Sequence, residues 1–275
     1  MRAEVLCKVF EHAEMIDNWC KINGGERAFT ALFGSQNYNL DTKDSDVDTK
    51  SVIIPKLEDW TWGDLDKYNT TLTMPDGSHA EIKCLPDMCK QYIKCNINFL
   101  ETLYTEYVDV ADNWAWLYSD LLDMRDKLST SNMYKIGKTW LGYLKQSIDR
   151  AFGSVSISLG YNPALGYNPK SLMTAMRIKE TFYRFFMQGY SFDAAIDMSN
   201  MRDELLQIKT EPVPYDNAIV YREALVKWSD EIASPFIQYN FQNKNEFDAV
   251  WHMKLLCKEA YEEKGRLKKY VADLL

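Results

Sequence analysis

The sequence predicts an α+β protein in which a mixed sheet with helices is followed by an all-helical part. Short apolar and β-branched segments, which are typical of strands, occur only before about residue 110. Long amphipathic segments with helical spacing fill the chain after that residue. With 275 residues, of which 46% are hydrophobic, the chain is long enough for a substantial core. We therefore expect two domains, residues 1–110 and residues 111–275.

In the first domain, helical and strand patterns alternate. Apolar residues recur at helical intervals between about residues 3 and 20, and Asn23-Gly24-Gly25 then ends the pattern. Pro75-Asp76-Gly77 is a turn sequence of the kind that closes a hairpin, and Pro86 stands where a helix can begin. These elements predict a mixed sheet with helices on one side. Four segments have the composition of strands: residues 27–33, 47–54, 70–73 and 80–84.

The second domain is expected to be helical throughout. Its sequence lacks β-branched runs, and its apolar residues recur at the spacing of one helix face. Six stretches show this pattern: residues 112–128, 131–152, 168–189, 199–209, 217–234 and 244–272.

Composition and charge argue against several classes of protein. No apolar run approaches the roughly 18 to 20 residues that span a bilayer, and the N-terminus lacks a signal peptide's apolar stretch. The six cysteines and three histidines are scattered without zinc spacing, which predicts reduced thiols in packing roles. The net charge of −8 argues against a protein that coats nucleic acid non-specifically, but it does not exclude a local basic groove. We expect a cytoplasmic protein with no membrane partner, and the sequence carries no signal for an oligomeric state.

The segment from Gly34 to Asp48 combines a glycine-serine turn with two aspartates at alternate positions. Asp46 and Asp48 are expected on an extended segment, where residues two apart face the same side and can bind divalent cations together. Gly34 permits a tight turn and the close approach of a backbone N–H to a phosphate, and the Ser35 hydroxyl can donate to the same group. Each element alone is common in turns and on solvent-facing strands. Their combination favours metal-assisted phosphoryl chemistry.

Nucleotidyl transfer is one reaction that needs this combination. The protein must align an attacking hydroxyl with an α-phosphate and stabilise the charge that builds on the leaving pyrophosphate. Two cations about 4 Å apart can activate the attacking oxygen and stabilise the leaving one. Magnesium prefers carboxylates together with phosphate oxygens as ligands.

The spacing Gly34-Ser35, ten residues, then Asp46-x-Asp48 resembles the DNA polymerase beta superfamily of nucleotidyltransferases. With the residues between, it is similar to the superfamily's RNA repair pathway branch, which is widespread in bacteria and phages. Downstream segments continue this resemblance in the expected order as far as about residue 232. The matching residues are Tyr38, Leu40, Thr42 and Ser45, then Glu81-Ile-Lys-Cys-Leu85, Asn96-Ile-Asn98-Phe-Leu100-Glu101, Gly142-Tyr143-Leu-Lys145, Lys170, Arg177 and Arg202-Asp-Glu-Leu205.

The resemblance implies a polymerase-beta-like catalytic domain and a helical domain that closes over the nucleotide. It also implies transfer of NMP from an NTP, such as ATP, to an acceptor hydroxyl, with an RNA end as acceptor. Two Mg²⁺ ions, or Mn²⁺, would serve as cofactors. Nucleotidylation of a protein or small molecule, with AMP or UMP, and a non-catalytic nucleotide-binding module are the alternatives. The implied metal ligands and catalytic residues are Asp46, Asp48 and Glu81, and the implied nucleotide-binding residues are Gly34, Ser35, Lys170 and Arg177.

Three of these roles have alternatives in the residues themselves. Glu81 alternates with apolar neighbours on a short strand, so it could simply face solvent, and Asp76 is then the other candidate ligand. Lys170 and Arg177 are two helical turns apart and are expected on one helix face. They could contact phosphate, or they could form surface ion pairs with Glu180 or Asp193.

Overall fold

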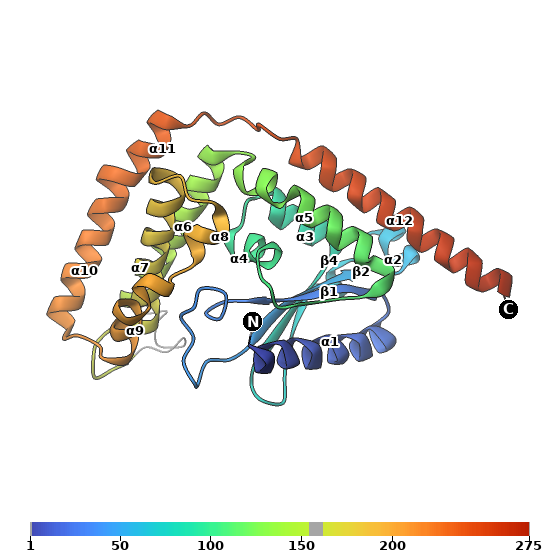
Figure 1. Cartoon of the computed structure of the whole chain (residues 1–275), viewed down its shortest axis with the longest axis horizontal. Helices are drawn as coiled ribbons and strands as arrows, with labels where there is room; N and C mark the ends of the chain where they lie inside the picture. The colour runs from blue at the N-terminus through green and yellow to red at the C-terminus, as the bar shows by residue number, and fades with distance from the viewer. Residues whose placement is uncertain (1, 154–161, 275) are drawn as a thin grey trace. The chain divides into compact units, whose positions relative to one another are not determined.

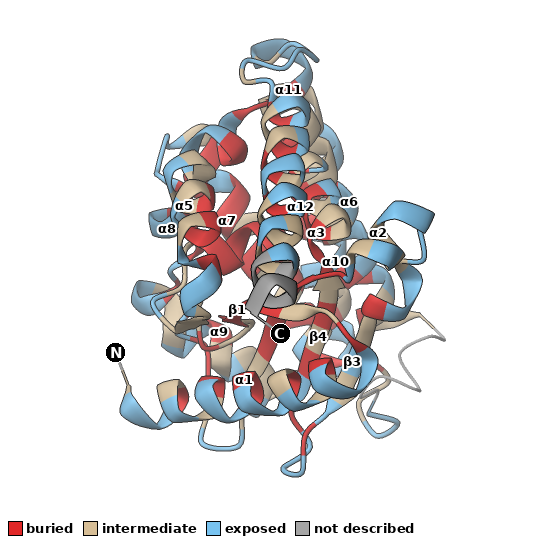
Figure 2. Cartoon of the chain, turned by 90° about the vertical axis from the view of Figure 1, so that its right-hand side faces the viewer, coloured by how far each residue is buried: buried red, intermediate tan, exposed pale blue. Residues whose placement is uncertain are grey.

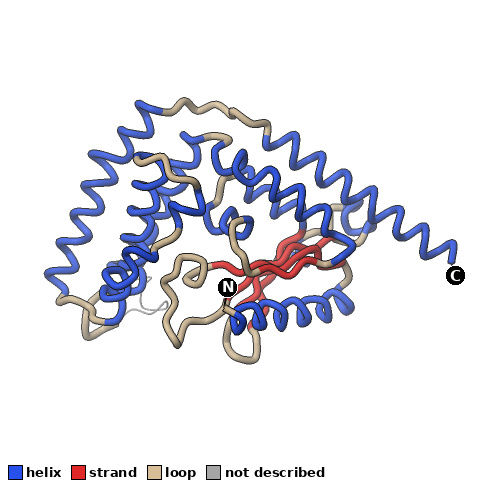
Figure 3. Tube along the Cα trace, viewed as in Figure 1, coloured by secondary structure: helices blue, strands red, loops and turns tan. Residues whose placement is uncertain are grey.

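The computed structural model describes residues 2–153 and 162–274, and over these residues the chain is an α+β protein with one mixed sheet (Figure 3). Contacts divide the chain into two compact units. The first contains Met1–Asn37, Lys43–Ser131 and Asn245–Leu275, and the second contains Tyr38–Thr42 and Asn132–Lys244. All of the strands in the described residues belong to the first unit.

The sheet of the first unit has the strand order β3-β4-β2-β1-β5. β2 and β4 run parallel and the other neighbours run antiparallel, so the mixed sheet is confirmed. The four expected strands are present, and β5 adds an unpredicted edge strand too short to show a periodic pattern. The strands are β1 (Glu26–Phe33), β2 (Asp48–Ile54), β3 (Thr70–Thr73), β4 (His79–Cys84) and β5 (Val108–Val110).

Helix α1 (Ala3–Asn23) covers one face of this sheet, as Figure 1 shows. Its apolar stripe is buried, and Ile16 packs with Ile53 and Ile82 in one cluster. Burial of one such side chain stabilises the fold by roughly 1.5–3 kcal/mol. The helix ends at Gly24, which has a φ of 87° and donates its N–H to the carbonyl of Cys20. The first predicted helix is therefore confirmed, and so is its termination at the Asn23-Gly24-Gly25 sequence.

Other helices cover the opposite face, so the expectation of helices on one side only was wrong (Figure 1). The Tyr118 ring of α5 lies 4.8 Å from that of Phe29 on β1, which places α5 in the first unit. The C-terminal helix α12 also belongs there, because it contacts α2, α3 and α5. The expected boundary after residue 110 therefore differs from the division by contacts. The other α-helices in the described residues of this unit are α2 (Leu57–Trp62), α3 (Leu85–Ile93), α4 (Ile97–Leu100), α5 (Ala115–Thr130) and α12 (Ala249–Leu274).

The regular elements in the described residues of the second unit are all helices, as the amphipathic pattern predicts. Its core is aromatic: the Trp140 ring lies 5.3 Å from Phe185, 5.4 Å from Phe186 and 6.0 Å from Phe192. Figure 2 colours much of α7 as buried. π-helical turns extend α7 and α10, at Tyr183–Met187 and Ser229–Ala233. The helices are α6 (Met133–Phe152), α7 (Pro169–Phe182), α8 (Phe192–Ile196), α9 (Arg202–Thr210), α10 (Tyr215–Trp228) and α11 (Ser234–Asn240).

Two further expectations from composition can be compared with the structure. Among the described helices, none combines the length and the apolar character that a membrane crossing requires. All six cysteines are free thiols, as their scattered positions predict. Cys89 on α3 and Cys257 on α12 approach each other, with 3.7 Å between the two Sγ atoms.

Candidate active site

The glycine-serine turn and the Asp48 carboxylate lie at the same end of the sheet. β1 ends at Phe33, which is paired with Asp48 in the antiparallel register of β1 and β2. Gly34 then turns the chain with a φ of 94°, a conformation that favours glycine. A Cβ atom added to Gly34 would meet no heavy atom within 4 Å, so the backbone conformation, and not crowding, requires glycine there. Ser35 follows directly in the turn and is half-buried.

Hydrogen bonds within the first unit hold the turn in place. The Asn37 N–H donates to the carbonyl of Gly34 at 3.0 Å, and the Asn37 side chain donates to the carbonyl of Leu32 at 3.0 Å. The Gly34 N–H donates to the carboxylate of Glu101 at 3.4 Å, and Glu101 is fully buried. The sequence places Glu101 in a segment that carries the family resemblance, Asn96-Ile-Asn98-Phe-Leu100-Glu101, but predicts no role for its side chain. Its position indicates that this buried carboxylate anchors the start of the turn.

Asp46 and Asp48 differ in their surroundings. Asp46 lies two residues before β2 and is exposed, and no described side chain or backbone group bonds to its carboxylate. Asp48 is the first residue of β2, and its Oδ1 accepts the backbone N–H of His79 at 2.8 Å. The His79 Nδ1 lies 3.6 Å from the same oxygen. Asp48 is therefore held in place, while Asp46 presents a charge with no internal partner in the described chain.

Glu81 lies on β4 opposite Lys50 of β2, and the two side chains form an ion pair. Lys83 also approaches Glu81, with 3.4 Å between Nζ and Oε1. The Lys50 ammonium is buried and lies 3.9 Å from the ring centroid of Phe33 and 4.4 Å from that of Phe99. Sequence reasoning did not identify Lys50. Lys50 lies two residues after Asp48 on the strand, and residues two apart share one face. This spacing could have indicated that Lys50 faces the same side as the candidate metal ligand.

The metal-binding prediction can be tested against these contacts. The described residues contain no group of three or more His, Cys, Asp or Glu side chains that could hold a metal ion. Asp46 and Asp48 still fit Mg²⁺, which commonly binds one or two carboxylates and completes its shell with water and substrate phosphate oxygens. Glu81 fits such a site only if Lys50 releases it. The donor set therefore suits a metal that arrives with the nucleotide.

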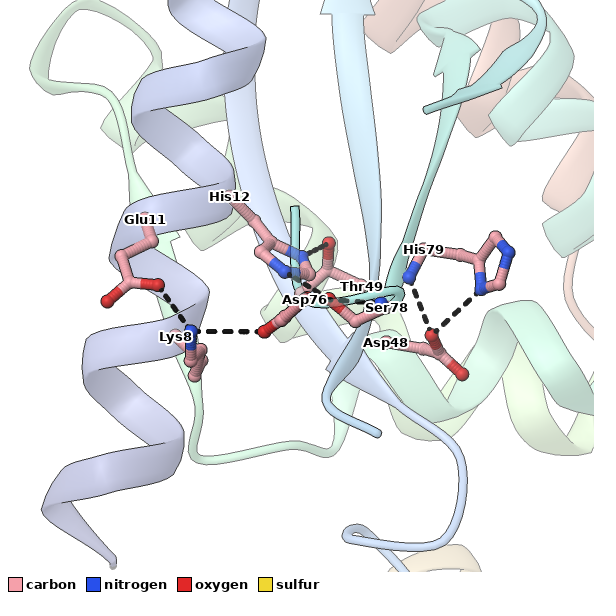
Figure 4. A network of polar contacts seen from close by, with 8 residues as sticks. All are labelled: Lys8, Glu11, His12, Asp48, Thr49, Asp76, Ser78 and His79. Carbon is pink, nitrogen blue, oxygen red and sulfur yellow. Dashed lines mark hydrogen bonds and ion pairs between the residues drawn. The ribbon is translucent and has the colours of Figure 1, made fainter. Parts of the chain in front are cut away.

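Asp76, the other candidate ligand, belongs to a polar network that joins α1 to the starts of β2 and β4 (Figure 4). Its carboxylate accepts the Ser78 hydroxyl at 2.6 Å and lies 3.0 Å from the Lys8 ammonium. These hydrogen bonds from Ser78 and Lys8 hold the pKa of Asp76 well below its usual range. The contacts indicate a role in fixing the β3–β4 turn.

His12 forms the centre of this network. Its Nδ1 lies 2.9 Å from the Thr49 hydroxyl and its Nε2 lies 3.0 Å from the Ser78 hydroxyl (Figure 4). Thr49 follows Asp48 and Ser78 precedes His79, so the imidazole holds together the two segments that position the Asp48 carboxylate. Burial lowers the pKa of His12 below its ordinary value of 6.5, although the carboxylates of Asp76 and Asp48 oppose this shift.

Replacing His12 by glutamine should reduce the pH dependence of stability. The unfolded chain binds a proton at His12 near pH 6.5, whereas the folded protein keeps the imidazole neutral to lower pH. The free energy of unfolding should therefore fall as the pH drops below 6.5, by at most about 1.4 kcal/mol per pH unit. Urea denaturation between pH 7.5 and pH 5 measures this slope. Equal slopes for the wild type and His12→Gln would contradict the assignment.

Lys170 and Arg177 both lie on α7 in the second unit, but in different surroundings. Lys170 is exposed, whereas Arg177 is buried and stacks on the Tyr38 ring, 3.8 Å from its centroid. Glu180 forms its ion pair with Arg184, at 2.8 Å, and not with Arg177. Within the described residues, the Arg177 Nη1 has no hydrogen-bond partner. Arg177 therefore keeps donor capacity that a phosphate could use.

Comparisons with known proteins do not assign this chain to a family. No family model matches the chain, and no curated protein matches it. The chemistry of the site must therefore be inferred from its own residues: a glycine turn, two aspartates where β2 begins, and an ion-paired glutamate on the neighbouring strand.

Proposed function

We propose that this protein is a metal-dependent nucleotidyltransferase of the polymerase-beta type, which transfers NMP from an NTP to an acceptor hydroxyl. The observation that carries the proposal is the pairing of Phe33 with Asp48 across β1 and β2. This register places a turn suited to phosphate beside a carboxylate suited to Mg²⁺, and nucleotidyl transfer needs both together. The spacing of Gly34, Ser35, Asp46 and Asp48 supports the same conclusion.

Each residue would have a definite role in this reaction. Gly34 and Ser35 would bind the triphosphate through the turn, and Asp46 and Asp48 would hold the metal against it. The bound Mg²⁺ or Mn²⁺ ions would activate the attacking hydroxyl and stabilise charge on the pyrophosphate. Glu81 would become a third metal ligand once its ion pair with Lys50 is broken. Lys170 and Arg177 would contact the phosphates from a helical domain that closes over the nucleotide.

The acceptor we propose is an RNA end, on the strength of the resemblance to the RNA repair pathway branch. Nucleotidylation of a protein or small molecule is the second candidate, and the net charge of −8 favours it over binding of a long polynucleotide. A non-catalytic nucleotide-binding module is the third candidate. The ion pair of Glu81 with Lys50 favours it, because the pair keeps one of the three carboxylates from the metal.

Incubation with each α-labelled NTP tests the proposal and separates the candidates. With Mg²⁺, or with Mn²⁺ in its place, we expect transfer of label, and electrophoresis would distinguish labelled RNA from labelled protein. Label on RNA ends supports the first candidate, and label on protein or on a small molecule supports the second. Nucleotide binding that is indifferent to Mg²⁺, with no transfer, would favour the non-catalytic module.

A further inference from the structure

The segment Tyr38–Thr42, which we call the connecting segment, belongs to the second unit although the residues on both sides of it belong to the first. Along the chain it lies between the Gly34-Ser35 turn and Asp46. Tyr38 and Leu40 are buried. The ten residues between Ser35 and Asp46 are therefore not a free loop, because their middle part is packed into the helical unit.

The backbone of the connecting segment is held by the α8–α9 corner, residues 197–202. The Arg202 guanidinium donates to two carbonyls of the segment, from Nη1 to Asn39 and from Nη2 to Asp41. Arg202 also lies 3.6 Å from the Asp41 carboxylate. The Met198 N–H donates to the carbonyl of Tyr38 at 3.1 Å. One arginine therefore bridges two alternate carbonyls and fixes the path of the chain between them.

The conformation of Asn39 requires this support. Its φ of 58° lies in the left-handed region, which costs free energy for a residue with a side chain. Its Nδ2 donates to the Asp197 carboxylate and to the Ser199 hydroxyl, each at 3.0 Å. The corner is itself held, because the Arg184 guanidinium donates to the carbonyl of Asp197. A strained residue persists only where its surroundings hold it, and such residues gather at functional sites.

The side chain of Tyr38 supplies a second attachment. Its ring lies under the buried Arg177 guanidinium, 3.8 Å from centroid to Cζ. Aromatic stacking leaves the N–H groups in the plane of the guanidinium available to other acceptors. Arg177 can therefore hold Tyr38 and still bind a phosphate with Nη1, which has no partner in the described chain.

We propose that Arg202 is a positioning residue for nucleotidyl transfer, acting through the connecting segment on Asp46, which lies in the loop before β2. Its two hydrogen bonds, to residues seven and five positions before Asp46, fix where the chain leaves the helical unit. Because a displacement of about 1 Å can cost about 100-fold in rate, control of this exit point matters to the chemistry. This inference rests on the proposed function, but the attachment of the segment can be measured without it.

Arg202→Gln removes the double attachment, and Arg202→Lys keeps the charge with a single donor group. We expect kcat to fall about 10- to 100-fold in Arg202→Gln and less in Arg202→Lys. The Mg²⁺ concentration for half-maximal rate should rise, while the KM for NTP changes less. Lys227→Gln is the matched control, because Lys227 is exposed in the same unit and only approaches Glu231, at 3.9 Å. A wild-type rate and Mg²⁺ dependence in Arg202→Gln would overturn the proposal.

Amide hydrogen exchange provides the independent measurement. Exchange across residues 38–48 should be faster in Arg202→Gln by about tenfold, because the variant loses hydrogen bonds from a charged donor that oppose local opening, and it should be unchanged in Lys227→Gln. If Arg202→Gln does not fold, Asn39→Ala tests the same attachment, since it removes the hydrogen bonds to Asp197 and Ser199. Unchanged exchange in a folded variant would refute the inference. A wild-type protein that transfers no label would instead defeat the proposed function, and the exchange experiment would still decide whether the attachment exists.

Discussion

Asparagine in place of Asp46 or Asp48 should abolish most nucleotidyl transfer while leaving the fold intact. The change removes one negative charge at the metal and alters the shape of the side chain very little. Loss of a preorganised charge at a reaction centre costs on the order of 10² to 10³ in kcat. Asp46 has no partner in the described chain, and an asparagine at position 48 can still accept the His79 N–H. We therefore expect unchanged thermal denaturation alongside the lost activity.

Transfer from an α-labelled NTP, titrated with Mg²⁺, measures this effect. The wild type should saturate with Mg²⁺, and the double variant Asp46→Ala, Asp48→Ala should show no transfer at any concentration. Asp44→Asn is the matched control, because Asp44 is exposed in the same loop two residues before Asp46. Label transfer that survives the double substitution, or an equal loss in Asp44→Asn, would contradict the assignment of these carboxylates.

Alanine in place of Trp140 should destabilise the protein more than any other single change considered for the helical unit. The indole is fully buried among the rings of Phe185, Phe186 and Phe192. Truncation of a buried tryptophan leaves a cavity and typically costs about 3–5 kcal/mol. Trp140→Phe should cost much less, because it keeps an aromatic ring and removes an indole N–H that has no partner among the described residues.

Urea denaturation followed by far-ultraviolet circular dichroism measures both Trp140 variants. Trp62→Ala is the control for loss of an indole, because Trp62 is 86% exposed and its removal should change the free energy of unfolding by less than about 0.5 kcal/mol. A loss below about 1 kcal/mol in Trp140→Ala would show that the aromatic cluster is not the core of this unit.

Local sequence patterns predicted the regular elements well and their grouping poorly. The strands at residues 27–33 and 47–54 are confirmed: the first is a short apolar segment that ends at Gly34, and the second is rich in β-branched residues and ends before Pro55. The amphipathic pattern of α5 shows which side of the helix is apolar, but not what covers that side. Tyr118 packs against Phe29, nearly ninety residues away, and this contact assigns α5 to the sheet-containing unit.

In the candidate site, too, some features follow from local sequence and others from packing between distant segments. The sequence alone determined the Gly34-Ser35 turn and the two aspartates, because their chemistry depends on residue type and short spacing. The pairing of Glu81 with Lys50 could not be predicted from local patterns, since the register between β2 and β4 depends on the whole sheet. Only the tertiary structure, likewise, brought Arg202 to the carbonyls of Asn39 and Asp41. Periodicity specifies faces within an element, whereas the partners of those faces are set by packing between distant segments.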